Sequence, residues 1–281
     1  MKKVKLLLSL LITITLLMTF ISPAMSAESK LHEVLARGYL IAGSGSTNAP
    51  WHFTDDKGQL TGFDIDMARI VAKALFNDPT KVKFVKQSSD ARIPNLVTGK
   101  VDVVFQFMTI TGERAQLVDF TIPYYREGIS VLMSTKGKYK SLEELQKAGS
   151  KATLAMLQNV YADEWAHKIV PNSKVDQYDD QALVIQAVNT KRADAAVVDL
   201  SNIRWLVNQY PDRYLDITQG WNPNSYGGAV RQGDQTWLNF VNTALHEAMT
   251  GVNFEFYAAS FKKYFAVDLA PPAIGFPLEY K

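Results

Sequence analysis

Short apolar runs alternate with stretches of helical periodicity along most of this 281-residue chain. In the stretch 64–76, apolar residues recur at roughly helical spacing, which predicts an amphipathic helix. The apolar runs that predict strands are 39–42, 82–85, 101–105, 152–157 and 195–198. Because strands separated by helices are typical of parallel βαβ units, the chain is predicted to have an α/β fold.

The alternation occurs twice, with the second set beginning after a predicted strand at 129–133. In this second set, Ser141 followed by Glu144 predicts a capped helix start. Asn159 is a candidate cap for a helix that ends near residue 169. Further predicted elements are helices at 182–189 and 236–265, the latter broken near Gly251, and a strand at 226–230. Two such sets predict two α/β lobes, with a ligand site in the cleft between them.

Residues 1–27 have the pattern of a secretory signal peptide. A basic start is followed by an apolar run, a proline and small residues that suit a peptidase: Lys2, Lys3 and Lys5, then 6–21, Pro23, and Ser26 with Ala27. The alternative is a membrane anchor, but the apolar run is shorter than the ~20 residues that a spanning helix needs. We therefore expect this segment to be cleaved after Ser26 or Ala27 during export.

Charge and composition narrow the classes of molecule that the protein is expected to bind. The signal segment holds three lysines and no acids, so 27 basic and 28 acidic residues remain without it, a net charge of −1. A near-neutral protein argues against nucleic acid or an anionic membrane surface as partner. The chain has no cysteine, which excludes disulfides, thiolate chemistry and lipid attachment at the cleavage site. Its four histidines are scattered singly, so neither a metal site nor a cofactor is expected.

Several short motifs occur in the order found in one known family. They are Ala49-Pro50-Trp51, 62–66, 93–96 with 99–102, 108–114 including Gly112-Glu113-Arg114, 118–121 with 123–125, and 193–199. Together they span nearly all of the chain after the signal segment. On these motifs the chain resembles the type II periplasmic solute-binding proteins of amino-acid uptake transporters, which form family 3 of the bacterial extracellular solute-binding proteins.

The resemblance implies a fold and a role. It implies two lobes, each a mostly parallel sheet flanked by helices, joined by hinge strands near 128–131 and 226–230. We expect a discontinuous first lobe of residues 28–127 with 229–281, and a second lobe of 128–228. The implied function is capture of a small α-amino acid or related polar solute for an ABC importer. The implied partners are that ligand and the transporter permease, and the protein itself is expected to be a monomeric, unlipidated periplasmic protein and not an enzyme.

The resemblance also implies which residues bind the two charged ends of the ligand. Arg114 matches the family position that binds the ligand carboxylate, a task that suits the planar guanidinium fork. Thr109 matches a position that adds hydrogen bonds to the same carboxylate. Asp199 matches the position that binds the ligand ammonium, although an aspartate there can also cap the following helix. Asp64 and Asp66 are interpreted as the cap and first turn of a helix.

Departures from the family pattern bear on the ligand side chain. Asn48 stands where many relatives have an aromatic residue, and Phe107 stands where a small residue is frequent. The second-lobe loop is Gln158-Asn159-Val160, bulkier than the usual Gly-Ser/Thr-Thr and without its threonine. Because the first-lobe turn at 44–48 has no acid, we predict a ligand with a neutral side chain. The aromatic walls would come from Trp51 and Phe107, and the uncharged hydrogen bonds from Ser89, Gln106 and Asn159.

Two other functional classes are open. Periplasmic cyclohexadienyl dehydratases share this fold, and such an enzyme needs a general acid with a raised pKa in the cleft. Asp163 and Glu164 are the nearby candidates, although both fit better in the first turn of a helix. A sensor module is a third class, but it would be tethered to membrane and signalling segments that this sequence does not show.

Overall fold

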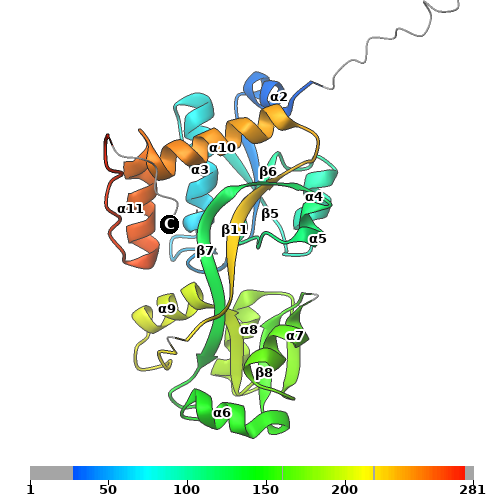
Figure 1. Ribbon diagram of the computed structural model, residues 1–281, viewed down its shortest axis with the longest axis vertical. Helices are drawn as coiled ribbons and strands as arrows, with labels where there is room; N and C mark the ends of the chain where they lie inside the picture. Colours follow the sequence, from blue (N-terminus) through cyan, green and yellow to red (C-terminus); the bar gives the residue numbers. More distant parts are fainter. Residues whose placement is uncertain (1–27, 160, 218, 276–281) are drawn as a thin grey trace, which may run out of the picture.

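The computed structural model describes residues 28–159, 161–217 and 219–275. Two lobes lie one above the other, and two long strands run from one lobe to the other (Figure 1). The predicted α/β class and two-lobe architecture are confirmed. In the described part of the chain, none of the helices is both long and apolar enough to cross a membrane.

The first lobe begins with a strand–helix–strand unit whose strands are parallel. Its elements are α2 (Lys30–Arg37), β1 (Leu40–Ser44), the small strands β2 (Thr47–Asn48), β3 (His52–Thr54) and β4 (Leu60–Thr61), α3 (Phe63–Phe76), β5 (Val82–Lys86), α4 (Arg92–Val97), β6 (Val103–Val104) and α5 (Gly112–Ala115). Strand β1 pairs in parallel with β5 on one side and with β6 on the other. The chain returns to this lobe at its end, where α10 (Gln235–Thr250) and α11 (Phe254–Phe265) pack against α3.

The second lobe repeats the parallel arrangement. Its elements are α6 (Leu142–Ala148), a 3₁₀ turn at Gly149–Lys151, β8 (Thr153–Leu157), α7 (Ala162–Ile169), β9 (Lys174–Tyr178), α8 (Gln181–Asn189), β10 (Ala195–Asp199) and α9 (Leu200–Gln209). Strand β8 lies between β9 and β10 and is parallel to both. The carboxyl ends of β8 and β10 carry Leu157 and Asp199, which places their following loops at the cleft.

The strands that join the lobes are longer than the sequence predicted. Strand β7 covers Asp119–Met133 and β11 covers Trp221–Val230, and the two are antiparallel over most of that length. They link the two lobe sheets into one hydrogen-bonded order, β5-β1-β6-β11-β7-β10-β8-β9. Gly228 lies so close to Phe105 that a Cβ would come within 2.6 Å of its ring, so this glycine permits close packing inside the first lobe.

Local sequence signals explain several element ends. Ser141 caps α6 by accepting a hydrogen bond from the Glu144 N–H, as predicted, and the Glu144 side chain accepts one from the N–H of Lys140, the residue before the cap. The predicted break near Gly251 is also confirmed, because α10 ends at this residue. The hydrophobic core is divided in the same way as the lobes, with Trp51, Phe63 and Trp237 in a large first-lobe cluster and separate clusters in the second lobe.

The interpretation of Asp64 and Asp66 as cap and first turn was partly wrong. The N-cap of α3 is Gly62, and both aspartates lie in the first turn. The buried Asp64 carboxylate instead accepts hydrogen bonds from the Tyr124 hydroxyl at 2.6 Å and the Phe107 N–H at 2.8 Å, and its Oδ2 lies 2.9 Å from His52 Nδ1. Such a fully bonded carboxylate fixes the backbone at Phe107, which lines the cleft.

Candidate functional site

A small cavity lies between the lobes and is lined from both of them. The first lobe contributes Ser89, Arg92, Phe107, Thr109 and Arg114, and the second contributes Met156, Leu157, Gln158, Asn159, Trp165, Gln181, Val197, Val198 and Asp199, with Ile129 and Tyr226 from the joining strands. Six of the eight predicted site residues therefore meet here: Arg114, Asp199, Thr109, Phe107, Asn159 and Ser89. Its volume is about 60 Å³, which at ~10–15 Å³ per water corresponds to a handful of small ligand atoms.

Arg114 is held in place by its own segment. Thr111 caps the short helix α5 by accepting a hydrogen bond from the Arg114 N–H. The Arg114 Nη1 donates to the Thr109 carbonyl at 2.9 Å, which directs the guanidinium toward the cavity wall. Burial lowers the pKa of Arg114 from its ordinary value, but an arginine remains protonated at neutral pH.

Arg92 is a second cation on the same wall, and the sequence analysis missed it. Its side chain is buried, its Nε donates to the Ser89 carbonyl at 2.6 Å, and its Nη1 donates to the Gln106 carbonyl at 3.0 Å. The guanidinium also lies over the Phe107 ring, 5.3 Å from its centroid. Burial, with the charge of Arg114 as the next cause, lowers the pKa of Arg92 to about 9.

Neither guanidinium is directly paired with a carboxylate in the described part of the chain. Among residues 28–159, 161–217 and 219–275, no ion pair includes Arg92 or Arg114. Two buried like charges that are not directly ion-paired are costly, because each has lost its hydration. This wall of the cavity therefore favours an anionic group on whatever enters it.

Asp199 lies on the opposite wall, at the end of β10. It precedes α9 but, within the described residues, its side chain makes no capping hydrogen bond, so the capping role considered from sequence is not used. Burial raises the pKa of Asp199 to about 7, while a hydrogen bond from the Tyr226 hydroxyl and the charge of Arg92 act in the other direction. A desolvated carboxyl of this kind favours a cationic group beside it.

The second-lobe loop is shaped by Asn159. Its Oδ1 accepts from the Tyr161 N–H at 2.8 Å and its Nδ2 donates to the Leu157 carbonyl at 2.8 Å, which fixes the turn before α7. The prediction that Asn159 caps this helix was wrong, because the N-cap position is Tyr161, two residues further on. The Trp165 side chain follows on α7 and also lines the cavity.

The two remaining predicted residues lie outside this cavity. Trp51 has no exposed surface and packs edge-on against Tyr125 and Tyr226, with ring centroids 4.7 and 5.0 Å away. Asn48 is also buried, and it borders a wider hollow at the mouth of the cleft that shares Ser89 and Phe107 with the inner cavity.

Both residues instead take part in hydrogen bonds between the lobes. The Trp51 Nε1 donates to the Ser201 hydroxyl at 3.0 Å, and the Asn202 Nδ2 donates to Asn48 Oδ1 at 2.6 Å and to the Ala49 carbonyl. Ser201 and Asn202 begin α9 of the second lobe. The lobes are therefore in contact on this side of the joining strands, and we call this arrangement the closed form.

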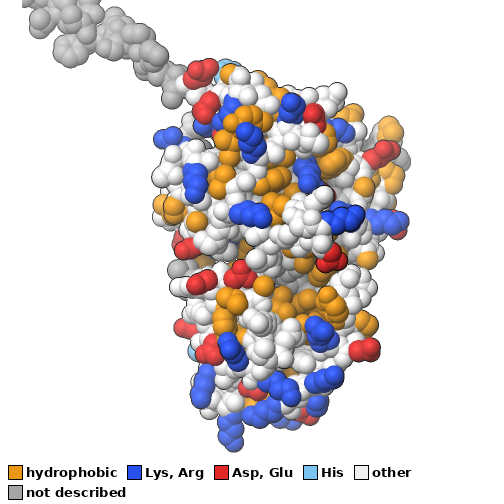
Figure 2. Space-filling model, turned by 180° about the vertical axis from the view of Figure 1, so that it is seen from behind, with side chains coloured by type: hydrophobic (Ala, Val, Ile, Leu, Met, Phe, Trp, Pro, Cys, Tyr) orange, Lys and Arg blue, Asp and Glu red, His pale blue; other side chains and the backbone are white. Residues whose placement is uncertain are grey.

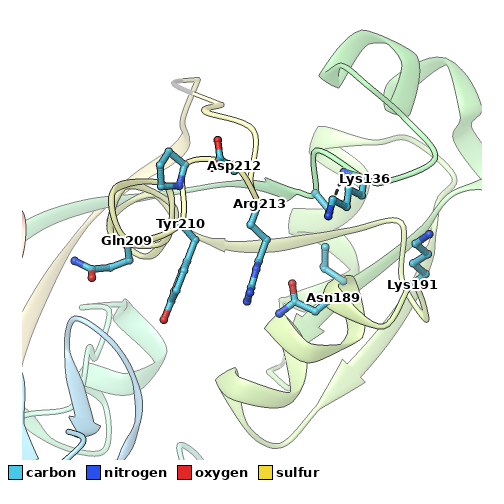
Figure 3. A pocket seen from close by; sticks show the side chains of 10 residues that line it. Lys136, Asn189, Lys191, Gln209, Tyr210, Asp212 and Arg213 are labelled. Atoms are coloured by element: carbon cyan, nitrogen blue, oxygen red, sulfur yellow. Dashed lines mark hydrogen bonds between the residues drawn. The ribbon is translucent and has the colours of Figure 1, made fainter.

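The largest hollows lie elsewhere and have different chemistry. One, of about 720 Å³, is lined by Lys136, Lys191 and Arg213 together with Tyr210 and Asp212 (Figure 3). It belongs to the second lobe, whose far end gathers Lys and Arg side chains (Figure 2). None of the predicted site residues borders it. In the described residues, no cluster of His, Cys, Asp or Glu has the arrangement needed to hold a metal ion.

A local signal could have identified Arg92. It lies in the first turn of α4, where the positive end of the helix dipole disfavours a cation. A basic residue kept at such a position, two residues before Pro94, indicates that something outside the helix holds it there. Tyr226 and Trp165 gave no comparable signal, because buried aromatic residues are ordinary in a core.

The lobes, the joining strands and a buried inter-lobe cavity define a type II periplasmic binding protein fold. Comparison with known proteins gives the family: residues 40–266 match the bacterial extracellular solute-binding proteins, family 3, and the chain belongs to this family.

Individual relatives are similar over most of the chain. The chain is 29% identical to the L-cystine-binding protein TcyJ of Escherichia coli K12 over 86% of this chain and 88% of the relative. It is 30% identical to the glutamine-binding protein GlnH of an ABC transporter in Bacillus subtilis 168, over 76% of each chain. Among solved structures, the ancestral amino acid-binding protein AncCDT-1, described as a precursor of cyclohexadienyl dehydratase, is 33% identical with a TM-score of 0.74, and the match covers 84% of this chain and all of that one.

Proposed function

We propose that the protein is the solute-binding component of an ABC importer and that it captures a small α-amino acid between its lobes. The observation that carries the proposal is the charge arrangement of the cavity. Two guanidinium groups without a carboxylate partner among the described residues face a desolvated carboxyl on the other lobe. An amino-acid zwitterion supplies the opposite charge to each wall.

The ligand would bind with a defined direction. Arg114 would donate hydrogen bonds from its remaining N–H groups to the α-carboxylate, with Thr109 beside it. Asp199 and the Tyr226 hydroxyl would receive the α-ammonium. In this arrangement the ligand touches both lobes, so it stabilises the closed form over the open one.

The side chain of the ligand would be small and uncharged. Arg92 and Arg114 together repel a basic side chain, while Phe107, Met156 and Trp165 provide apolar surface. The volume of about 60 Å³ in the closed form favours a small side chain. Gln158, Gln181 and Asn159 offer uncharged hydrogen bonds from the second lobe.

The lobe boundaries proposed for closure are 28–127 with 229–281 for the first lobe and 128–228 for the second. The separate core clusters of the two lobes and the crossing of β7 and β11 near these positions support this division. The chain would be a monomer that presents its closed form to the permease. It would be exported, cleaved after Ser26 or Ala27 and left without a lipid; N-terminal sequencing of protein released by osmotic shock tests this.

A thermal-shift screen against the twenty amino acids, cystine, and related small acids and amines tests the proposed function. A ligand at 100 times its Kd stabilises the folded state by about 2.7 kcal/mol. At ~2–4 °C per kcal/mol for a protein of this size, the melting temperature rises by several degrees. Small neutral amino acids should give the largest shifts, and the absence of a shift with any amino acid would refute the proposal.

The dehydratase alternative has one observation in its favour. Asp199 is a cleft carboxyl with a raised pKa, which is what a general acid needs. The acids considered from sequence, Asp163 and Glu164, are exposed in the first turn of α7 and do not line the cavity. Consumption of prephenate or arogenate by the purified protein would establish this alternative, and we expect none.

A further inference from the structure

Glu127 lies where β7 passes from one lobe to the other, and its carboxyl group is buried. Only 6% of the residue is exposed. Its Oε1 accepts a hydrogen bond from the Gly128 N–H at 2.9 Å. Its Oε2 has no hydrogen-bond partner among the residues that the structure describes. It does not line the ligand cavity, so the proposed ligand contacts leave it without a role.

A second acceptor without a donor lies directly across the strand pair. Asn224 of β11 is the register partner of Glu127. Its Nδ2 donates to the Asn222 carbonyl at 3.1 Å, whereas its Oδ1 has no partner within the described chain. The amide orientation is fixed, because exchanging its N and O would place an oxygen against the Asn222 carbonyl.

The two unpartnered oxygens belong to side chains on the same face of the ladder. Directly opposite residues of an antiparallel pair share a face, and residues two positions apart share it too. Tyr125 and Tyr226 are the next register pair on this face, and their rings stack with centroids 6.4 Å apart. Glu127 and Asn224 are therefore neighbours, and a proton on Glu127 Oε2 would supply the hydrogen that both oxygens lack.

Asp199 adds a reason for that proton to bind. Burial, and then the charge of Asp199, raise the pKa of Glu127 to about 8, while the Ser201 hydroxyl and the Gly128 N–H lower it in part. Two neighbouring buried carboxyls cannot both ionise at low cost, so the pair retains one proton near neutral pH. The other titratable and charged groups around the pair are Arg92 of α4, Asp64 of α3, Arg204 of α9, and Tyr125 and Tyr226 of the joining strands.

We propose that Glu127 is a proton-binding site in the hinge, protonated in the closed ligand-free protein, and that its ionisation favours separation of the lobes. Within the described residues no ion pair includes Glu127, so the negative charge that forms when the proton leaves is not directly paired with a cation in the closed form. Opening lets water reach the hinge and the adjacent Asp199, which stabilises both carboxylates. In the absence of a cationic group next to Asp199, the proton on Glu127 thus reduces the negative charge of the carboxyl pair.

The pH dependence follows from the direction of the pKa shift. A carboxyl whose pKa is higher in the folded protein than in the unfolded chain contributes stability that is complete below the unfolded pKa. That stability is lost as pH rises through the folded pKa. For Glu127 the window runs from its ordinary value of 4.5 to about 8.

The test compares the ligand-free wild-type protein with Glu127→Gln, which keeps the shape and provides a permanent N–H donor toward Asn224. Urea unfolding is measured between pH 5 and 9. One bound proton changes the unfolding constant by roughly tenfold per pH unit, so the wild type should weaken relative to Glu127→Gln by about tenfold for each pH unit between pH 5 and pH 8. Glu255→Gln, at an exposed position in the first turn of α11, is the matched control and should follow the wild type.

Small-angle X-ray scattering on the same samples tests the coupling to opening. The radius of gyration of the wild type should increase between pH 6 and pH 9, while that of Glu127→Gln should stay at the compact value. Parallel pH curves of stability for wild type and Glu127→Gln would overturn the proton site. A pH-dependent stability without any change in scattering would overturn its link to the lobes. Because no ligand is present, neither outcome depends on the proposed function.

Discussion

The two walls of the cleft carry opposite charge and hold it in different ways. On the first lobe, Arg92 and Arg114 are anchored by backbone carbonyls of their own lobe, and their charge persists at any pH near neutrality. On the second lobe, Asp199 ends a strand, and its pKa lies close to neutral pH. The first-lobe wall can bind an anion at any pH near neutrality. The second-lobe wall can bind either a cation or a proton.

This difference teaches how a closed cleft can exist without ligand. The guanidinium groups keep their positions because the carbonyls of Ser89, Gln106 and Thr109 bond them from the side away from the cavity. The Asp199 carboxyl accepts a hydrogen bond from the Tyr226 hydroxyl, but it is buried close to Glu127, so the two carboxyls retain one proton between them when the lobes close. The anionic end of a ligand should therefore control affinity at every pH, and the cationic end should control it only where Asp199 is ionised.

The largest effect is expected at the fixed wall. Replacing Arg114 by Ala leaves the ligand carboxylate buried without its partner, which costs ~2–5 kcal/mol. Affinity for the best neutral amino acid should fall roughly thirty-fold to several thousand-fold, measured by calorimetry.

Arg192→Ala, which removes an exposed second-lobe arginine, is the control and should bind as the wild type does. Arg114→Ala should also melt within a few degrees of the wild type without ligand. Near-wild-type affinity in Arg114→Ala would show that the first wall does not hold the carboxylate.

Titration of Asp199 on the second wall should make the affinity for the ligand depend on pH. A proton on Asp199 competes with the ligand ammonium, so affinity should fall by up to about tenfold per pH unit below pH 7. Asp199→Asn should bind weakly at pH 8 and lose most of this pH dependence. Calorimetric titrations of both proteins at pH 5.5, 6.5 and 8 measure it. A wild-type affinity that is constant over this pH range would contradict the proposal that Asp199 binds the ligand ammonium.

The pair of cations on the first wall should also select against basic ligands. A lysine or arginine side chain in the cavity would lie beside Arg92 and Arg114, where like charges in a desolvated site repel each other. Small neutral amino acids should therefore bind at least tenfold more tightly than arginine or lysine in the same competition titration. Tight and exclusive binding of arginine or lysine would contradict the prediction that the ligand has a neutral side chain.

The smallest effect is expected from the contacts outside the cavity. Ser201→Ala removes the acceptor of the buried Trp51 Nε1–H, and an unsatisfied donor of this kind costs ~1–3 kcal/mol. The ligand-free melting temperature should drop by a few degrees, with Ser150→Ala at an exposed position as the control. An unchanged melting temperature would show that this inter-lobe bond contributes nothing to the closed form.

Much of the fold was predictable because it rests on patterns that repeat along the chain. Apolar runs and helical spacing gave the elements on both sides of the cleft, and Ser141 and Gly251 marked helix ends as predicted. The full length of β7 was not predictable. Its first half carries Pro123 and charged residues, and it becomes a strand only because β11 pairs with it.

The candidate site was predictable only in part. Motif positions identified Arg114, Asp199 and Thr109, and the structure places all three on one cavity. Trp51, part of the motif Ala49-Pro50-Trp51, was predicted as an aromatic wall of the ligand site, whereas its ring packs with Tyr125 and Tyr226 and does not line the cavity. Contacts of this kind join residues far apart in the sequence, so no local pattern reveals them.

A crystal structure of the protein with the amino acid that gives the largest thermal shift tests the central claim most directly. We expect the ligand in the inter-lobe cavity, with its carboxylate bonded by both donors of the Arg114 fork and its ammonium within hydrogen-bond distance of Asp199. A ligand bound with Arg114 turned to solvent, or bound outside the cavity between the lobes, would contradict it.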